Sequence, residues 1–335
     1  MERSSIDSQR VYKQDPLAPP SLLAFEIPMT ETATLTVQHG RKQIQAILDG
    51  HDDRFIVLLT PTSDSFPLPL SQDYTELKSL CSAFSKDLLI VLYTELDYLA
   101  VPHSNTGIHS TTEDVTTCNI NKSLHVLRQH FHKASSSGIP IACDVNDNIA
   151  HNYFDDLLSL GISNSKLASS QSHTALVSGL PFPVAFSVNK NDDLLPTLEA
   201  IDSASSGHQY LGISQEGLIA ISRSRGNSYG FVKLNSNEHE HPGSYGTLPG
   251  MENKRGRPKV LLDCAAHADI YKGVACVRNE MARGDKLVIG TTMKISINGS
   301  CKGEAAESQL KPEDVYKELV CKLNDLRLLV NSQCT

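Results

Sequence analysis

The sequence predicts an α/β protein built as a (β/α)8 barrel, with an N-terminal arm and a β-hairpin inserted before the sixth barrel strand. Eight short runs rich in Val, Ile and Leu recur along the chain, and segments of helical periodicity lie between most of them. Strands buried on both faces of a parallel sheet have this composition, and their alternation with helices is typical of repeated β-α units. The length of 335 residues is within the range of a single barrel domain.

The predicted elements follow this pattern in order. The amphipathic segment with Leu124, Leu127 and Phe131 is expected in the outer ring of helices, and Lys311 to Val330 is expected to form a C-terminal helix. Two β-type runs between Gln209 and Ser222 predict the inserted hairpin. The predicted barrel strands are Phe55–Leu59, Leu88–Tyr93, Ile139–Asp144, Ile162–Lys166, Val184–Ser187, Gly230–Leu234, Val260–Asp263 and Leu287–Thr292.

Two regions and a cellular setting follow from composition. We expect residues 1–50 to form an N-terminal arm that caps the barrel or mediates homo-oligomerisation, and residues 51–335 to form the barrel. A net charge of -8 argues against a broad nucleic-acid surface. The eight cysteines form no C-x-x-C pair, the polar N-terminus lacks the apolar core of a signal peptide, and no run approaches the length needed to span a bilayer. These features predict a cytoplasmic protein without membrane or nucleic-acid partners.

Several segments, in the same order along the chain, resemble landmarks of the class I 3-deoxy-7-phosphoheptulonate (DAHP) synthases. They are PPSLL at Pro19, GRKQIQAILDGHDDRFIVLLTP at Gly40, SSQSHTALVSGLPFPVAF at Ser169, GHQYLGIS at Gly207, RGN at Arg225 and GDKLVIG at Gly284. The resemblance implies a (β/α)8 barrel that joins phosphoenolpyruvate to erythrose 4-phosphate at its C-terminal face. It also implies a divalent metal held by Cys, His, Glu and Asp.

The positions that match the family's metal ligands carry other residues. Thr62 stands for the Cys, Ala266 for the His with His267 one residue later, and Lys294 for the Glu, while the segment with the Asp is missing before Lys311. A positive charge about 4 Å from a divalent cation costs about 8 kcal/mol at an effective dielectric constant of about 20. The sequence therefore predicts no metal and no cofactor.

The positions that match the phosphate contacts have also changed. The family's R-V-Y-F-E-K-P-R stretch aligns with residues 93–100, its fifth-strand Lys with Ser187 and its sixth-strand Arg with Asn235, so that only Lys166 keeps a charge. Neutral side chains do not replace the charge-assisted hydrogen bonds that hold phosphate. The sequence therefore predicts a degenerate member without DAHP synthase activity, acting on a small, apolar, non-phosphorylated molecule.

The leading hypothesis is a metal-independent cyclase, of Diels-Alder or another pericyclic type, that acts on an uncharged apolar secondary metabolite. A second hypothesis is an aldolase that forms a Schiff base at Lys166 or Lys294. The favoured alternative for these two lysines is that they are solvated or pair with a carboxylate such as Asp144. A third is a non-catalytic regulator or scaffold of an active DAHP synthase. The candidate catalytic residues are Tyr93, Tyr98, Lys166, Lys294 and His267, and the candidate substrate-binding residues are Thr62, Leu99, Asp144, Ser187 and Asn235.

Overall fold

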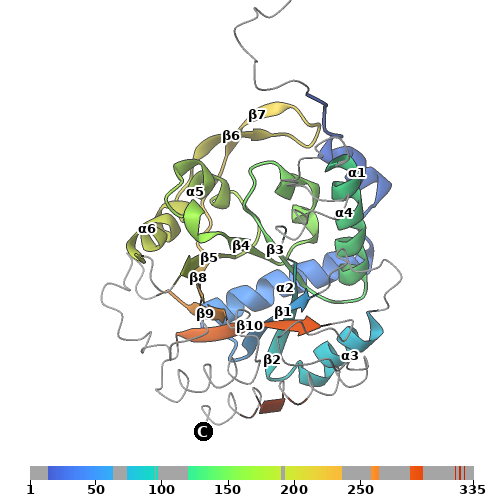
Figure 1. The fold of residues 1–335 in the computed structure, drawn as a ribbon, viewed down its shortest axis with the longest axis vertical. Coiled ribbons are helices and arrows are strands. Elements are labelled where there is room, and N and C mark those ends of the chain that lie inside the picture. Colours follow the sequence, from blue (N-terminus) through green and yellow to red (C-terminus); the bar gives the residue numbers. More distant parts are fainter. Residues whose placement is uncertain are drawn as a thin grey trace, which may run out of the picture.

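Eight parallel strands close into a barrel in the computed structural model of the chain, and this confirms the predicted (β/α)8 fold (Figure 1). The structure describes residues 14–62, 74–94, 96, 120–189, 193–235, 258–263 and 287–296, together with residues 321, 324, 325 and 328. The barrel strands are β1 (Phe55–Thr62), β2 (Leu88–Thr94), β3 (Ile141–Asp144), β4 (Leu160–Ser163), β5 (Val184–Asn189), β8 (Gly230–Asn235), β9 (Val260–Asp263) and β10 (Val288–Ser296). They pair in the closed order β1-β10-β9-β8-β5-β4-β3-β2.

Helices occupy the connections between many of these strands. The predicted amphipathic segment forms α4, where Leu124, Leu127 and Phe131 are at most 1% exposed. The described helices are α1 (Pro20–Glu26), α2 (Glu31–Leu48), α3 (Thr75–Phe84), α4 (Ile120–Ser136), α5 (Gln171–Val177) and α6 (Leu195–Ala204), with short 3₁₀ helices η2 (Ala150–Tyr153), η3 (Asp155–Leu157) and η4 (Ser165–Leu167). Within the described ranges no helix is both long and apolar enough to cross a membrane.

The strands bury both of their faces, in two separate apolar clusters. In β2, Leu89, Val91 and Tyr93 belong to one cluster that has members from all eight barrel strands. The alternate residues Leu88 and Ile90 belong to a larger cluster that includes the side chains of the helices. Because side chains of a strand alternate between its faces, the first cluster is the barrel interior and the second lies between the barrel and its helices.

Helix α2 closes the N-terminal end of the barrel. Its residues Ile44 and Ile47 are the helical members of the interior cluster. A Cβ at Gly40 would come within 2.5 Å of Ser159 Oγ and 3.0 Å of Pro140 Cβ, two residues that directly precede β4 and β3. The close approach of α2 to these strand starts requires glycine.

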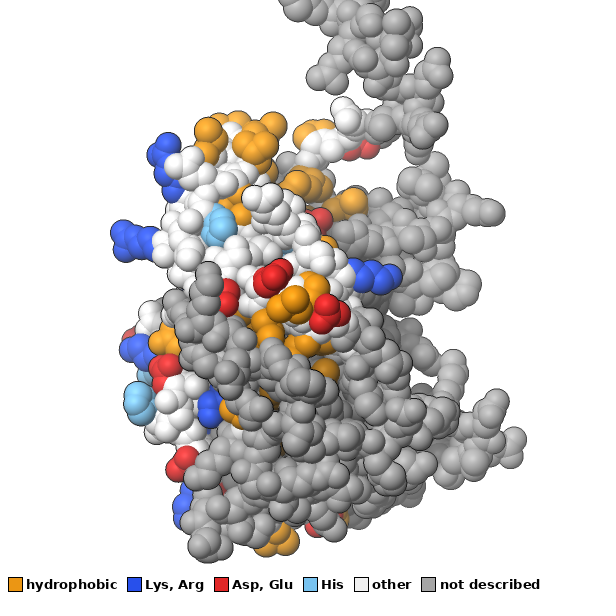
Figure 2. All heavy atoms as spheres, turned by 90° about the vertical axis from the view of Figure 1, so that its left-hand side faces the viewer, with side chains coloured by type: hydrophobic (Ala, Val, Ile, Leu, Met, Phe, Trp, Pro, Cys, Tyr) orange, Lys and Arg blue, Asp and Glu red, His pale blue; other side chains and the backbone are white. Residues whose placement is uncertain are grey.

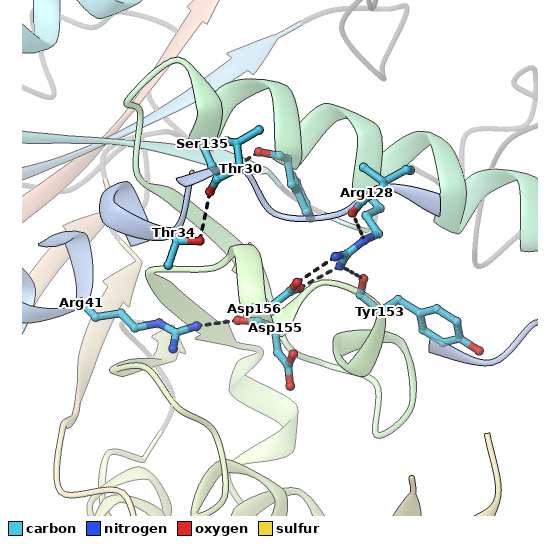
Figure 3. A network of polar contacts seen from close by, with 10 residues as sticks. Thr30, Thr34, Arg41, Arg128, Ser135, Tyr153, Asp155 and Asp156 are labelled. Atoms are coloured by element: carbon cyan, nitrogen blue, oxygen red, sulfur yellow. Dashed lines mark hydrogen bonds and ion pairs between the residues drawn. The ribbon is translucent and has the colours of Figure 1, made fainter. Parts of the chain in front are cut away.

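A buried arginine joins the helices beside this closed end (Figure 3). Arg128 of α4 is 2% exposed and donates to both carboxylate oxygens of Asp156, at 2.8 Å each. It also donates to the carbonyls of Tyr153, at 2.7 Å, and Ile27, at 3.2 Å. One side chain thereby connects α4 with the end of α1 and with η2 and η3.

The predicted hairpin is present before the sixth barrel strand, as β6 (Gln209–Ile213) and β7 (Ile219–Arg223). Its strands pair antiparallel, and the backbone N–H of Ser21 in α1 donates to the carbonyl of Gln215 in the hairpin turn, at 2.9 Å. Figure 2 shows hydrophobic side chains at the end of the molecule where Figure 1 places this hairpin. Leu211 is 74% exposed and Ile219 is 87% exposed, so the hairpin carries an apolar outer surface.

The structure corrects one strand in particular. The prediction placed Lys166 at the end of the fourth strand, but β4 ends at Ser163 and Lys166 lies in η4. The change of structure occurs at Asn164, whose side chain accepts a hydrogen bond from the Lys166 backbone N–H and caps η4. Residues 101–119 and most of the predicted helix from Lys311 to Val330 lie outside the described residues.

Candidate functional site

A cavity of about 390 Å³ lies at the C-terminal ends of the barrel strands. Among the described residues of its lining Ile162 is the one aliphatic residue, and the others present hydroxyl, amide, carboxylate or ammonium groups. The lining consists of Tyr93, Asp144, Asn146, Ile162, Asn164, Ser165, Lys166, Ser187, Asn189, Lys233 and Asn235. In a (β/α)8 barrel this end is where enzyme active sites are found.

Tyr93 and Asp144 form one half of the cavity floor. Their side chains come from β2 and β3, are 4% and 6% exposed, and join through the Tyr93 hydroxyl, which donates to Asp144 Oδ1 at 2.8 Å. The backbone N–H of Leu96 donates to the other carboxylate oxygen, Oδ2, at 3.0 Å. Both oxygens of this buried carboxylate therefore have a donor, as burial of a charge requires.

Lys233 forms the other half of the floor, with Asp263 as its ion-pair partner. Lys233 is inward-facing on β8, 5% exposed, and its ammonium forms an ion pair with Asp263 at the end of the neighbouring strand β9. In the closed strand order β8 lies opposite β2, and the Lys233 Nζ stands 6.0 Å from the centre of the Tyr93 ring. The lysine thus reaches across the barrel, and the ring face and the Asp263 carboxylate both stabilise its charge.

A chain of hydrogen bonds runs from this lysine up to the rim. Lys233 Nζ donates to Asn235 Oδ1 at 3.3 Å, and Asn235 Nδ2 donates to Asn189 Oδ1 at 2.9 Å. Asn189 Nδ2 then donates to Ser165 Oγ at 3.3 Å. Because the ammonium can only donate, it fixes the direction in which each amide of the chain points.

The rim segment carries the second cation of the cavity, Lys166. Asn146 Oδ1 accepts a hydrogen bond from the Asn164 backbone N–H at 2.8 Å and so holds the start of η4 against the loop after β3. Lys166 is exposed and forms no ion pair with a described carboxylate. Lys166 is therefore solvated and not paired with Asp144, to which Tyr93 and Leu96 donate.

The cavity brings together five of the ten predicted site residues. Tyr93, Lys166, Asp144, Ser187 and Asn235 line it, and their roles stay proposals. Thr62 and Lys294 belong to the adjacent strands β1 and β10, but their side chains are not among those described. Tyr98, Leu99 and His267 lie outside the described residues.

Sequence reasoning missed Lys233, Asn146, Asn164 and Asn189. A signal for Lys233 was present, because Phe231, Lys233 and Asn235 alternate along one strand and share the face that points into the barrel. The three asparagines lie at or after strand ends, where the sequence alone does not show which loop side chains turn towards the cavity.

The described side chains at this end of the barrel do not fit a divalent cation. In the parts of the chain that the structure describes, no group of three or more His, Cys, Asp or Glu residues could hold a metal ion. Asp144 accepts hydrogen bonds on both oxygens, and the ammonium of Lys233 contacts Asp263. An ammonium beside a carboxylate opposes a second cation at the same carboxylate, because like charges repel strongly where water is largely excluded. That the substitutions at the family's metal-ligand positions prevent metal binding remains a prediction from the sequence.

A polar cavity with two lysines lies at the C-terminal end of this eight-stranded parallel barrel, where enzymes of this architecture have their active sites. Residues 27–331 match the DAHP synthetase I family, and the chain belongs to that family.

Named relatives extend over nearly the whole chain. It is 30% identical over 312 residues to the tyrosine-inhibited phospho-2-dehydro-3-deoxyheptonate aldolase of Schizosaccharomyces pombe, covering 89% of this chain and 82% of that protein. It is 29% identical over 300 residues to the Phe-sensitive phospho-2-dehydro-3-deoxyheptonate aldolase of Escherichia coli, covering 86% and 85%. The solved structure of the corresponding aldolase from Francisella tularensis has the same fold, with a TM-score of 0.79 at 24% identity, covering 96% of this chain and 99% of that one.

These relationships overturn the functional hypothesis drawn from the sequence. The proteins that resemble this chain along most of its length are named aldolases of one kind, so they point to that activity and not to a metal-independent cyclase. The same relationships contradict the two alternatives, a Schiff-base aldolase and a non-catalytic scaffold. The expected apolar substrate stays a prediction, and the described lining of the cavity, which is almost entirely polar, does not favour it. The error came from inferring a pocket from missing residues, whereas the replacing side chains that line the cavity, Tyr93, Ser187 and Asn235, are hydrogen-bonding groups.

Proposed function

We propose that the chain is an aldolase of the phospho-2-dehydro-3-deoxyheptonate type. The reaction joins phosphoenolpyruvate to erythrose 4-phosphate, or cleaves the product, at the C-terminal end of the barrel. The observation that carries this proposal is the polar cavity, whose dense set of hydroxyl, amide and ammonium groups suits an oxygen-rich, anionic substrate.

The positions of the two lysines support a substrate that is charged at both ends. Lys233 is buried at the floor, while Lys166 is exposed at the rim without a described carboxylate partner. The seven-carbon product has a carboxylate at one end and a phosphate at the other. An ammonium at each depth of the cavity provides a charge-assisted donor for each end.

The amides and hydroxyls between the lysines suit the middle of such a substrate. Asn189 and Asn235 are held by the hydrogen-bond chain, and Ser187 lies beside them on β5 with 6% exposure. Groups held in fixed positions lose little entropy when a polyol binds, and they orient the two reacting carbons towards each other.

The test is a direct assay of the purified chain with phosphoenolpyruvate and erythrose 4-phosphate, with and without added Mn²⁺. We expect loss of phosphoenolpyruvate together with release of phosphate and formation of the seven-carbon acid. Lys166→Met should lower kcat/KM by about ten- to a hundred-fold, the loss of one charge-assisted hydrogen bond.

Lys42→Met is the matched control, because Lys42 is an exposed lysine on α2 at the opposite end of the barrel. It should leave kcat/KM unchanged. The proposal fails if no product forms under either metal condition, or if Lys166→Met turns over as fast as Lys42→Met.

A further inference from the structure

The floor of the cavity holds a cation that is built into the barrel wall. Lys233 is 5% exposed, pairs with Asp263, donates to Asn235 and faces the Tyr93 ring. Three strands, β2, β8 and β9, supply the groups that contact it. A lysine is costly to bury, so a barrel that keeps one at this position and surrounds it with partners has built a specific site.

The ammonium of Lys233 keeps a donor for a ligand. A lysine has three N–H groups, and the described residues accept two of them, through Asp263 and the Asn235 side-chain oxygen. Nζ belongs to a side chain that lines the cavity. The remaining N–H is therefore available to an oxygen of a ligand that binds in the cavity.

We propose that Lys233 binds the carboxylate end of the substrate at the floor of the cavity. The proposal rests on the proposed aldolase function for the identity of the substrate, a three-carbon 2-oxo or enol acid. It rests on the structure alone for the site. Asp263 holds the ammonium in place and does not take part in binding a metal ion.

The donor set favours an organic anion over a cation at this place. Asp144 already accepts from Tyr93 and Leu96, and Asp263 already pairs with Lys233. A carboxylate needs one strong donor and neutral hydrogen-bonding neighbours, which Lys233 and Ser187 supply. A divalent cation needs several oxygen, nitrogen or sulfur ligands without an ammonium among them.

The hydrogen-bond chain gives Lys233 a second, positioning effect. Because Lys233 donates to Asn235, Asn235 donates to Asn189 and Asn189 donates to Ser165, a change at the floor reorients the amides up to the rim. Binding of a carboxylate at the floor is thereby linked to the segment that carries Lys166.

The first experiment separates the two ends of the substrate with simple probes, pyruvate for the carboxylate end and inorganic phosphate for the other, each titrated calorimetrically into the full chain. Lys233→Met should weaken pyruvate binding by at least about ten-fold, and Lys166→Met should change it by less than about two-fold. For inorganic phosphate the opposite is expected: Lys166→Met should weaken binding by at least about ten-fold, and Lys233→Met should change it by less than about two-fold. Equal pyruvate affinities for Lys233→Met and the wild-type chain overturn the proposal.

Two further variants control for folding. Lys233→Arg keeps a cation and should bind pyruvate more tightly than Lys233→Met, whereas a merely structural role predicts no such rescue. Combining Lys233→Met with Asp263→Asn neutralises the carboxylate that the single change deprives of its ammonium, and should raise the melting temperature above that of Lys233→Met without restoring pyruvate binding. Recovery of pyruvate binding in this double variant contradicts the proposal.

The second experiment is a titration with Mn²⁺ alone, followed by electron paramagnetic resonance. We expect no stoichiometric Mn²⁺ site that depends on Asp263. A stoichiometric site that is lost in Asp263→Asn shows that Asp263 binds metal, and overturns the assignment of Lys233. If the chain shows no aldolase turnover but its pyruvate binding depends on Lys233, only the proposed function is wrong. If the chain turns over and Lys233→Met leaves both turnover and pyruvate binding unchanged, only this inference is wrong.

Discussion

Replacement of Arg128 by methionine should destabilise the whole barrel, because this side chain joins three separate parts of the fold (Figure 3). Methionine keeps most of the buried aliphatic packing and removes the guanidinium. The change leaves the carbonyls of Tyr153 and Ile27 without their donor, at about 1 kcal/mol each. It also removes the two-point contact with Asp156, whose side chain is 38% exposed and can rehydrate, so that this loss is about 1 kcal/mol.

The expected loss in the free energy of unfolding is therefore about 3 kcal/mol. For a chain of 335 residues the entropy of unfolding is about 0.7 kcal/mol per kelvin, so the melting temperature should fall by about 4 °C. Differential scanning calorimetry measures this shift, and urea unfolding gives the free energy independently.

Arg54→Met is the matched control. Arg54 pairs with Asp52, two residues away, and the two side chains are 18% and 20% exposed, so that its loss should cost less than about 1 kcal/mol. If Arg128→Met melts within about 1 °C of Arg54→Met, the buried contacts do not stabilise the fold as argued.

Three further predictions concern pH and assembly. Burial, followed by the charge of Asp156, raises the pKa of Asp155 to about 6, so Asp155→Asn should increase the free energy of unfolding by about 1 to 2 kcal/mol at pH 8, and the gain should vanish below about pH 4. A gain that does not change with pH contradicts this. Burial lowers the pKa of His130 to about 4 from 6.5, so its stabilising effect is present above pH 6.5 and is lost as the pH falls towards 4. As the pH is lowered from about 7 to about 4.5, the free energy of unfolding of His130→Gln, measured with urea, should therefore rise by about 1 to 2 kcal/mol relative to that of the wild-type chain. Parallel dependences of the two free energies on pH would refute the reasoning. The exposed hairpin residues Ile219 and Ile221, at 87% and 66%, support the homo-oligomer expected from the sequence, so their joint replacement by Glu should lower the mass seen in sedimentation, and a monomeric wild-type chain would end that expectation.

Local sequence patterns were sufficient to predict the barrel. Buried parallel strands have a distinctive composition, and α4 has a distinctive period, so both can be recognised without knowledge of their neighbours. Strand ends were less certain, since a single capping side chain such as Asn164 decides where β4 stops and η4 begins. The functional hypothesis failed for a different reason, because it relied on residues that had disappeared, and the properties of the cavity depend on those that are present.

The sequence by itself determined the fold class and placed Tyr93, Asp144, Ser187 and Asn235 at one end of the barrel, because parallel strands bring their carboxyl ends together. Only the tertiary structure decided what surrounds those residues. Lys233 contacts Asp263, thirty positions later in the chain, and Tyr93 on the opposite side of the barrel. Neither contact can be recognised from a local pattern in the sequence. The polar character of the cavity depends on such distances through space, which the closure of the barrel creates.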